Sequence, residues 1–131
     1  MSVMREHHVR PEGLPPVNGY SHAVACQGRS VVVSGQVPLD AQGDLVGAGD
    51  PERQAEQVFA NLAVALAAAG AGMHDVVKLT VYLTDRADLA AFRRVRDRHL
   101  DTSRPPASTL VLVPGLLHPG FRIEIDAVAV R

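Results

Sequence analysis

The clearest pattern of hydrophobic and polar residues lies between residues 76 and 84. Apolar side chains alternate there with polar ones, which is the period of a strand that buries one of its faces. The apolar positions are Val77, Leu79, Val81 and Leu83, and the polar positions are Lys78, Thr80, Tyr82 and Thr84. The sequence therefore predicts a strand whose second face stays polar.

A different pattern, with apolar residues three or four positions apart, covers residues 51–69. This is the spacing of a helix with one buried stripe. Asp50 offers a side-chain acceptor before the first turn, Pro51 suits the first helical position, and Glu52 places a negative charge near the N-terminus of the helix. We expect a helix that begins at Pro51 and ends near Ala69.

Shorter elements are predicted before residue 51 and after residue 84. Residues 20–27 and 30–36 are rich in β-forming side chains, and the turn between them predicts a tight hairpin. A second helix should follow Asp88, with Phe92 toward the core and the arginines of residues 93–98 largely outward.

Two strands are expected in the last part of the chain, within residues 105–113 and 122–130. We expect them to pair with each other, because only a short loop rich in proline and glycine separates them. Glu124 and Asp126 fall on one face of the second strand. Burying an unpaired carboxylate costs several kcal/mol, so this face should meet water, a subunit interface or a ligand.

Together these elements give the order ββαβαββ, which is typical of an α+β domain with its helices on one face of a sheet. Two helices cannot cover both faces, so the polar face should meet water or another copy of the chain. Residues 1–19 contain several prolines and glycines. They are expected to form an irregular N-terminal arm ahead of a domain at residues 20–131.

Composition narrows the class of protein. The chain has 131 residues, 47% of them hydrophobic, which fits one domain with its own core. A formal net charge of −1 and a pI near 6.6 give no general attraction to nucleic acid or to an anionic membrane. The single cysteine, Cys26, cannot form an internal disulfide, and no apolar run approaches the length of a membrane span. We expect a cytoplasmic protein without membrane contact.

Five short segments carry a resemblance to a known family. They are 18–22 (NGYSH), 33–38 (VSGQVP), 75–83 (DVVKLTVYL), 106–109 (PAST) and 123–130 (IEIDAVAV). In this order and at this spacing the chain resembles the RidA family, also called the YjgF or L-PSP family. The resemblance implies a chorismate-mutase-like (YjgF-like) α+β fold in a homotrimer, with ligand clefts between subunits. It also implies hydrolysis of reactive enamines and imines, without any cofactor, to a 2-oxo acid and ammonia.

Three residues of the family's cleft are kept here. Tyr20 matches its tyrosine, Gly35 matches the glycine of its Ser-Gly-Gln strand end, and Glu124 matches the glutamate thought to position or activate the attacking water. The resemblance therefore makes Glu124 the candidate catalytic residue, with Tyr20 and Gly35 beside the substrate.

Three other cleft positions depart from the family's deaminase pattern. Ser108 replaces an arginine that holds the substrate carboxylate, Leu110 replaces a cysteine, and Arg93 replaces an asparagine. Losing a hydrogen bond to a charged group costs about 1.5–3 kcal/mol, so amino-acid-derived imines should bind poorly unless another guanidinium reaches the cleft. Arg93 and Arg104 are the candidates for that substitution.

Other functions remain open from the sequence alone. The cleft could bind a small molecule without catalysis, or the chain could act on RNA, as some family members are described to do. The arginines of residues 93–98 form the only basic patch, but aromatic residues that could stack on bases are few, so nucleic-acid binding is not expected. The scattered histidines have no metal-binding spacing, so no metal site is expected either.

Overall fold

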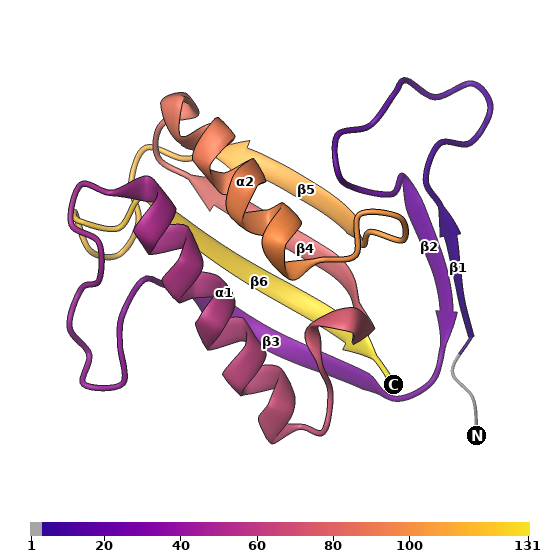
Figure 1. The fold of residues 1–131 in the computed structure, drawn as a ribbon, viewed down its shortest axis with the longest axis horizontal. Coiled ribbons are helices and arrows are strands. Elements are labelled where there is room, and N and C mark those ends of the chain that lie inside the picture. The colour runs from indigo at the N-terminus through magenta and orange to yellow at the C-terminus, as the bar shows by residue number, and fades with distance from the viewer. Residues whose placement is uncertain (1–3) are drawn as a thin grey trace.

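Four strands form the main sheet, in the spatial order β3-β6-β4-β5 (Figure 1). The computed structural model describes residues 4–131. The strand bounds are Ser30–Gln36 for β3, Val76–Leu83 for β4, Ala107–Leu112 for β5 and Ile123–Val130 for β6. Strand β6 is antiparallel to both of its neighbours, whereas β4 and β5 are parallel. Together with two helices, these strands confirm the predicted α+β class.

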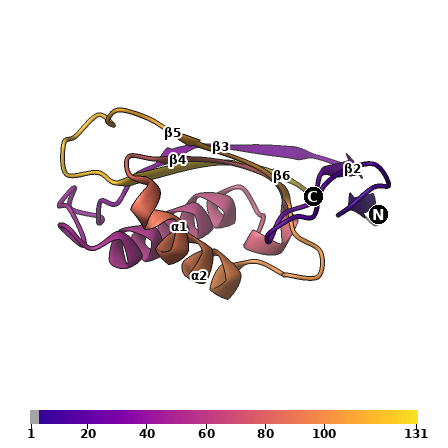
Figure 2. The ribbon, with the colours of Figure 1, turned by 90° about the horizontal axis from the view of Figure 1, so that it is seen from above.

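Both helices cover the same face of this sheet, as the prediction required (Figure 2). They are α1 at Pro51–Ala68 and α2 at Leu89–His99, and short 3-10 turns occupy Met73–Asp75 (η1) and Arg86–Asp88 (η2). The Asp50 carboxylate accepts a hydrogen bond from the Arg53 N–H at 3.1 Å, which caps α1. Within residues 4–131, no helix is long and apolar enough to cross a membrane.

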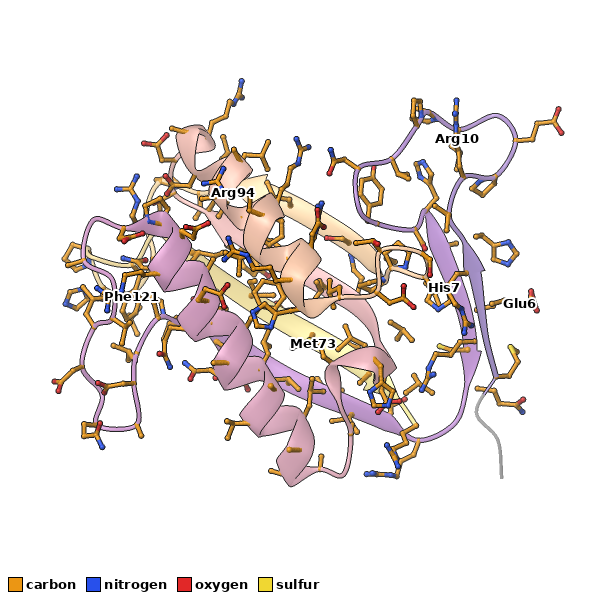
Figure 3. All side chains as sticks on the ribbon, viewed as in Figure 1. Glu6, His7, Arg10, Met73, Arg94 and Phe121 are labelled. Carbon is orange, nitrogen blue, oxygen red and sulfur yellow. The ribbon has the colours of Figure 1, made fainter. Side chains whose placement is uncertain are left out.

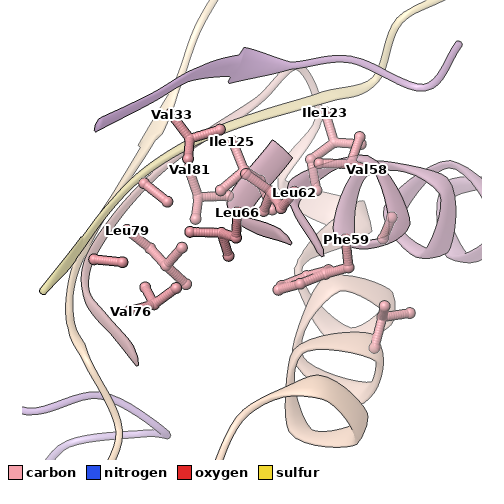
Figure 4. Close-up of a cluster of buried hydrophobic side chains, with 14 of the residues drawn as sticks. Val33, Val58, Phe59, Leu62, Leu66, Val76, Leu79, Val81, Ile123 and Ile125 are labelled. Atoms are coloured by element: carbon pink, nitrogen blue, oxygen red, sulfur yellow. The ribbon is translucent and has the colours of Figure 1, made fainter. Parts of the chain in front are cut away.

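The core lies between the two helices and the sheet, and Figure 4 shows its part beside α1. Phe59, Leu62 and Leu66 of α1 are fully buried against Val81 and Ile125 of the two central strands. Because successive strand residues point to opposite faces, burial of these positions leaves Tyr82 and Glu124 on the face without helices. The predicted polar face is therefore confirmed.

The expected hairpin between residues 20–27 and 30–36 is wrong. Strand β2, at Ala23–Gln27, pairs with an N-terminal strand, β1, at Met4–His8, and the two form a separate small sheet. After Gly28 the chain turns away from β2, because Arg29 exchanges two backbone hydrogen bonds with Arg131 at 2.7 and 2.9 Å. The segment predicted as an irregular arm thus contributes β1, and the element order gains one strand. The first three residues of that arm lie outside the described part.

The expected pairing between the strands now called β5 and β6 is also wrong, because β4 lies between them. Helix α2 returns the chain to the outer edge of β4, where β5 adds as a parallel neighbour. The loop at residues 113–122 then carries the chain past β4 to the other side. A short connection limited the distance between these strands but did not make them adjacent.

Candidate functional site

Two acids of β6, Glu124 and Asp126, lie on the open face of the sheet and are half-buried. The Tyr82 hydroxyl donates a hydrogen bond to Asp126 Oδ2 at 3.1 Å. This bond, with the negative charges of Asp126 and Glu124, raises the pKa of Tyr82 above its ordinary value. Asp126 is therefore engaged within the sheet, whereas the Glu124 carboxylate bonds to no other side chain in the described residues.

Gly35 provides the space for the Glu124 carboxylate. The pairing of β3 with β6 shifts register between Val33 and Gln36, so the glycine lies at an irregularity in the strand. A Cβ atom built on Gly35 would lie 2.1 Å from Glu124 Oε2. Only a residue without a side chain lets the carboxylate occupy this position.

The other four predicted site residues meet in a cavity of about 270 Å³ between α2 and β5, which we call the α2–β5 cavity. Its lining comprises Asn18, Tyr20, Leu89, Phe92, Arg93, Arg96, Ser108 and Leu110. Tyr20 is brought there by the residue that follows it: Ser21 donates to the Pro106 carbonyl from its backbone at 2.9 Å and to the Pro105 carbonyl from its hydroxyl at 2.6 Å. These bonds tie the segment after Tyr20 to the beginning of β5.

The six predicted residues fall into two groups on opposite faces of the sheet. Ser108 pairs with Leu79, whose side chain is buried under the helices, whereas Glu124 pairs with Tyr82 on the open face. Residues opposite each other in neighbouring strands point to the same side. Within one chain, Glu124 and Gly35 therefore cannot line the cavity that holds Ser108.

The two cavity arginines differ in their availability. Arg96 was expected to face outward, but it is buried, and its guanidinium donates to Asp97 at 2.9 Å and to both oxygens of Asn18 at 3.0 and 2.9 Å. Arg93 is half-buried and forms no hydrogen bond or ion pair with the described residues. Arg93 is thus the cation of this cavity that can bind an anionic ligand.

Arg104, the other candidate to replace the lost arginine, lies elsewhere. It donates to the backbone carbonyl of Arg5 at 3.0 Å and lines a different cavity together with His7, His74 and Asp101. It does not line the α2–β5 cavity, so the structure keeps only Arg93 of the two candidates.

The remaining arginines of α2 do not form an open basic surface. Arg94 extends from α2 (Figure 3) and donates to Glu52 of α1 at 3.2 Å. Arg98 binds Glu56 at 2.8 Å and Glu52 at 3.0 Å. These acids neutralise Arg94 and Arg98 and tie the two helices together, so Arg93 is the one unpaired cation that α2 offers in the described residues, too little for an extended phosphate-binding surface.

Arg96 is the one cavity residue that the sequence interpretation placed on the wrong side. Its spacing contained the signal, because Arg96 lies one turn after Phe92 and therefore on the same face of α2. Its guanidinium lies 5.7 Å from the centre of the Phe92 ring. A Cβ on Gly19 would come within 2.2 Å of the same guanidinium, so Arg96 fits against the backbone that leads to Tyr20.

The chain is similar to several known proteins over most of its length. The model of the family described as Endoribonuclease L-PSP matches residues 11–131. Protein DfrA of Myxococcus xanthus is 40% identical over 121 residues, which cover 92% of this chain and 88% of that protein. The 2-iminobutanoate/2-iminopropanoate deaminase of Mus musculus is 36% identical over 116 residues, covering 88% and 83% of the two chains.

A solved structure extends the similarity to the fold. The crystal structure of YyfB from Yersinia pestis, a member of the Rid protein family, superimposes with a TM-score of 0.87. The two chains are 36% identical, and the superposition covers 97% of this chain and 98% of that one.

Proposed function

Because this chain belongs to the RidA/YjgF/L-PSP family and has its single-domain α+β fold, we propose that it hydrolyses a reactive imine or enamine in a cleft between two subunits. The observation that carries this proposal is the separation of the candidate residues into two groups, one on the open face and one at the β5 edge. The relatives from Mus musculus and Capra hircus, each 36% identical in sequence, are 2-iminobutanoate/2-iminopropanoate deaminases, which supports imine hydrolysis as the reaction.

The assembly we propose is a homotrimer. The open face carries polar and apolar side chains without any helix above it, and it includes Val32 of the edge strand β3, which is 79% exposed. Turning this face toward a second copy would bury it and would bring Glu124 and Gly35 of one subunit toward the α2–β5 cavity of the next. The two halves of the site would then form one cleft.

In that cleft Glu124 is proposed to hold a water molecule against the carbon of the C=N bond. As the water oxygen attacks, the carboxylate accepts one of its protons and passes it toward the nitrogen. The carbon–oxygen bond forms and gives a carbinolamine. The carboxylate then takes the proton of the new hydroxyl and passes it to the nitrogen as the carbon–nitrogen bond breaks, so the products are a 2-oxo compound and ammonia. Water is the only co-reactant, so the reaction needs no cofactor. The hydroxyls of Tyr20 and Ser108 would orient the substrate.

The trimer gives a direct prediction. Light scattering of the purified protein at micromolar concentration should give a mass near three times 13.9 kDa. Substituting Val32 with aspartate should lower that mass, because it would place a charge in the buried interface. A stable wild-type monomer that hydrolyses imines would contradict the two-subunit cleft.

A second prediction concerns Ser108. Wild-type protein should hydrolyse 2-iminopropanoate, made in situ from alanine by an amino-acid oxidase, only weakly. Ser108→Arg should raise the rate about tenfold or more, because a guanidinium on a rigid strand adds a charge-assisted bond to the carboxylate. Thr102→Arg, on an exposed turn, is the matched control and should change nothing. A lower rate for Ser108→Arg would mean that the serine hydroxyl itself is required.

A further inference from the structure

A second, apolar space adjoins the α2–β5 cavity. It has a volume of about 220 Å³ and is lined by Leu83, Leu89, Leu110 and Leu112, with Arg86 beside them. Leu89 and Leu110 line both spaces. The two volumes are therefore neighbours that meet at these two leucines, and we call the second one the leucine compartment.

The two spaces differ in chemistry. The α2–β5 cavity offers the unpaired guanidinium of Arg93 and the hydroxyls of Ser108 and Tyr20, whereas the leucine compartment offers almost only hydrocarbon. Leu110 and Leu112 point to the same side of β5, since they are two residues apart on one strand. Leu112 is 44% exposed, and it lines the compartment together with three other leucines. An apolar ligand group placed there would remove this surface from water.

We propose that the cleft selects 2-imino acids with a branched or aromatic apolar side chain, such as those formed from leucine or phenylalanine. The carboxylate binds Arg93 in the α2–β5 cavity, and the side chain fills the leucine compartment. An apolar cavity of about 150 Å³ holds a benzene ring, so the compartment is large enough for a phenyl group. That the reacting group is an imine rests on the proposed function. That the ligand carries both a carboxylate and an apolar side chain rests on the chemistry of these two spaces.

Arg86 raises the alternative that the ligand is a dicarboxylate. Its side chain is exposed and lines the rim of the leucine compartment. A second cation could favour a ligand with a second carboxylate. The leucines oppose this choice, because a carboxylate among them would lose its hydration, while the stem of Arg86 can extend their apolar surface and keep its charge in water.

Equilibrium binding tests the selectivity independently of catalysis. The probes are the 2-oxo acids that hydrolysis would produce: phenylpyruvate, 4-methyl-2-oxopentanoate, pyruvate and, as a dicarboxylate, 2-oxoglutarate. Isothermal titration of the wild-type protein should show the first two binding about 10- to 100-fold more tightly than pyruvate, in line with the discrimination that an apolar pocket achieves. They should also bind more tightly than 2-oxoglutarate.

Two variants separate the two contacts. Arg93→Gln should weaken all four probes about tenfold or more, because each carries the carboxylate. Leu112→Asn should remove the preference for phenylpyruvate over pyruvate while leaving pyruvate itself nearly unchanged. Arg94→Gln, next along α2, and Val64→Asn, an exposed apolar position on α1, are the controls and should match the wild type. Light scattering of each variant checks that the assembly is intact.

Each outcome decides the matter. Pyruvate or 2-oxoglutarate binding as tightly as phenylpyruvate, or no binding by any probe, would overturn the proposed selectivity. So would a preference that survives Leu112→Asn. Selective binding without hydrolysis of the leucine-derived imine would instead keep this inference and reject the catalytic proposal, whereas hydrolysis of small imines without selectivity would do the reverse.

Discussion

Replacing Glu124 with glutamine is expected to lower the rate of imine hydrolysis by at least about 100-fold, which is typical for the loss of a general base. Glutamine keeps the size of the side chain but cannot accept the proton of the attacking water at neutral pH. The measurement is the rate at which an imine, made in situ from leucine or alanine by an amino-acid oxidase, disappears. The trimer and the affinity for 2-oxo acids should stay nearly unchanged.

The structure supplies a matched control for this change. Asp126 lies on the same strand and face as Glu124, but its carboxylate already accepts the hydrogen bond from Tyr82. Asp126→Asn removes one negative charge from the same face and should affect the rate far less. A comparable loss in both variants would point to the charge of the face rather than to a specific base.

Wild-type turnover by Glu124→Gln would reject the catalytic assignment of Glu124. If the wild-type protein also bound 2-oxo acids without hydrolysing any imine, the alternative of a ligand-binding trimer would replace the catalytic proposal. Nucleic-acid cleavage has less support from α2. Arg94 and Arg98 are paired with Glu52 and Glu56. Arg96 is buried, which leaves Arg93 as the unpaired arginine of this helix, and one cation does not make a basic surface.

Local patterns predicted the helices and the faces of the strands well, because those features depend on neighbouring residues. The Asp50-Pro51 start of α1 and the alternation of β4 were both confirmed. The predicted pairing of neighbouring strands was wrong in two places. Which strands become neighbours depends on which strand edges are free to form hydrogen bonds once the helices have packed. The length of the loop between β5 and β6 does not reveal that β4 lies between them.

The candidate site shows the same division between local and distant information. The motifs drew attention to Tyr20, Gly35, Glu124 and Ser108, but they carry no information on which face of the sheet each side chain reaches. The structure places Tyr20 and Ser108 at the α2–β5 cavity, and Glu124 with Gly35 on the open face. The charge of Arg96 suggested exposure, since a lone buried guanidinium is costly. Its burial became understandable only with Asn18 and Asp97 in place, and Asn18 is distant in sequence.

Gly35→Ala is expected to reduce hydrolysis to nearly the same extent as Glu124→Gln, about 100-fold, without unfolding the protein. The backbone at Gly35 does not have the positive φ angle that only glycine adopts readily. The three atoms nearest to an added methyl group all belong to the Glu124 side chain, and Oε2 lies 2.1 Å from the position of the new Cβ. The carboxylate must rotate away, and a base displaced by about 1 Å loses roughly 100-fold in rate.

A double-mutant cycle tests whether Gly35 acts through Glu124. In the Glu124→Gln background, Gly35→Ala should lower the residual rate only slightly, because the group that it displaces no longer serves as a base. Circular dichroism and light scattering should show an unchanged fold and trimer for both variants. Multiplied effects in the double variant would contradict this, since they would mean that Gly35 contributes through the backbone of the β3 bulge and not by leaving room for the carboxylate.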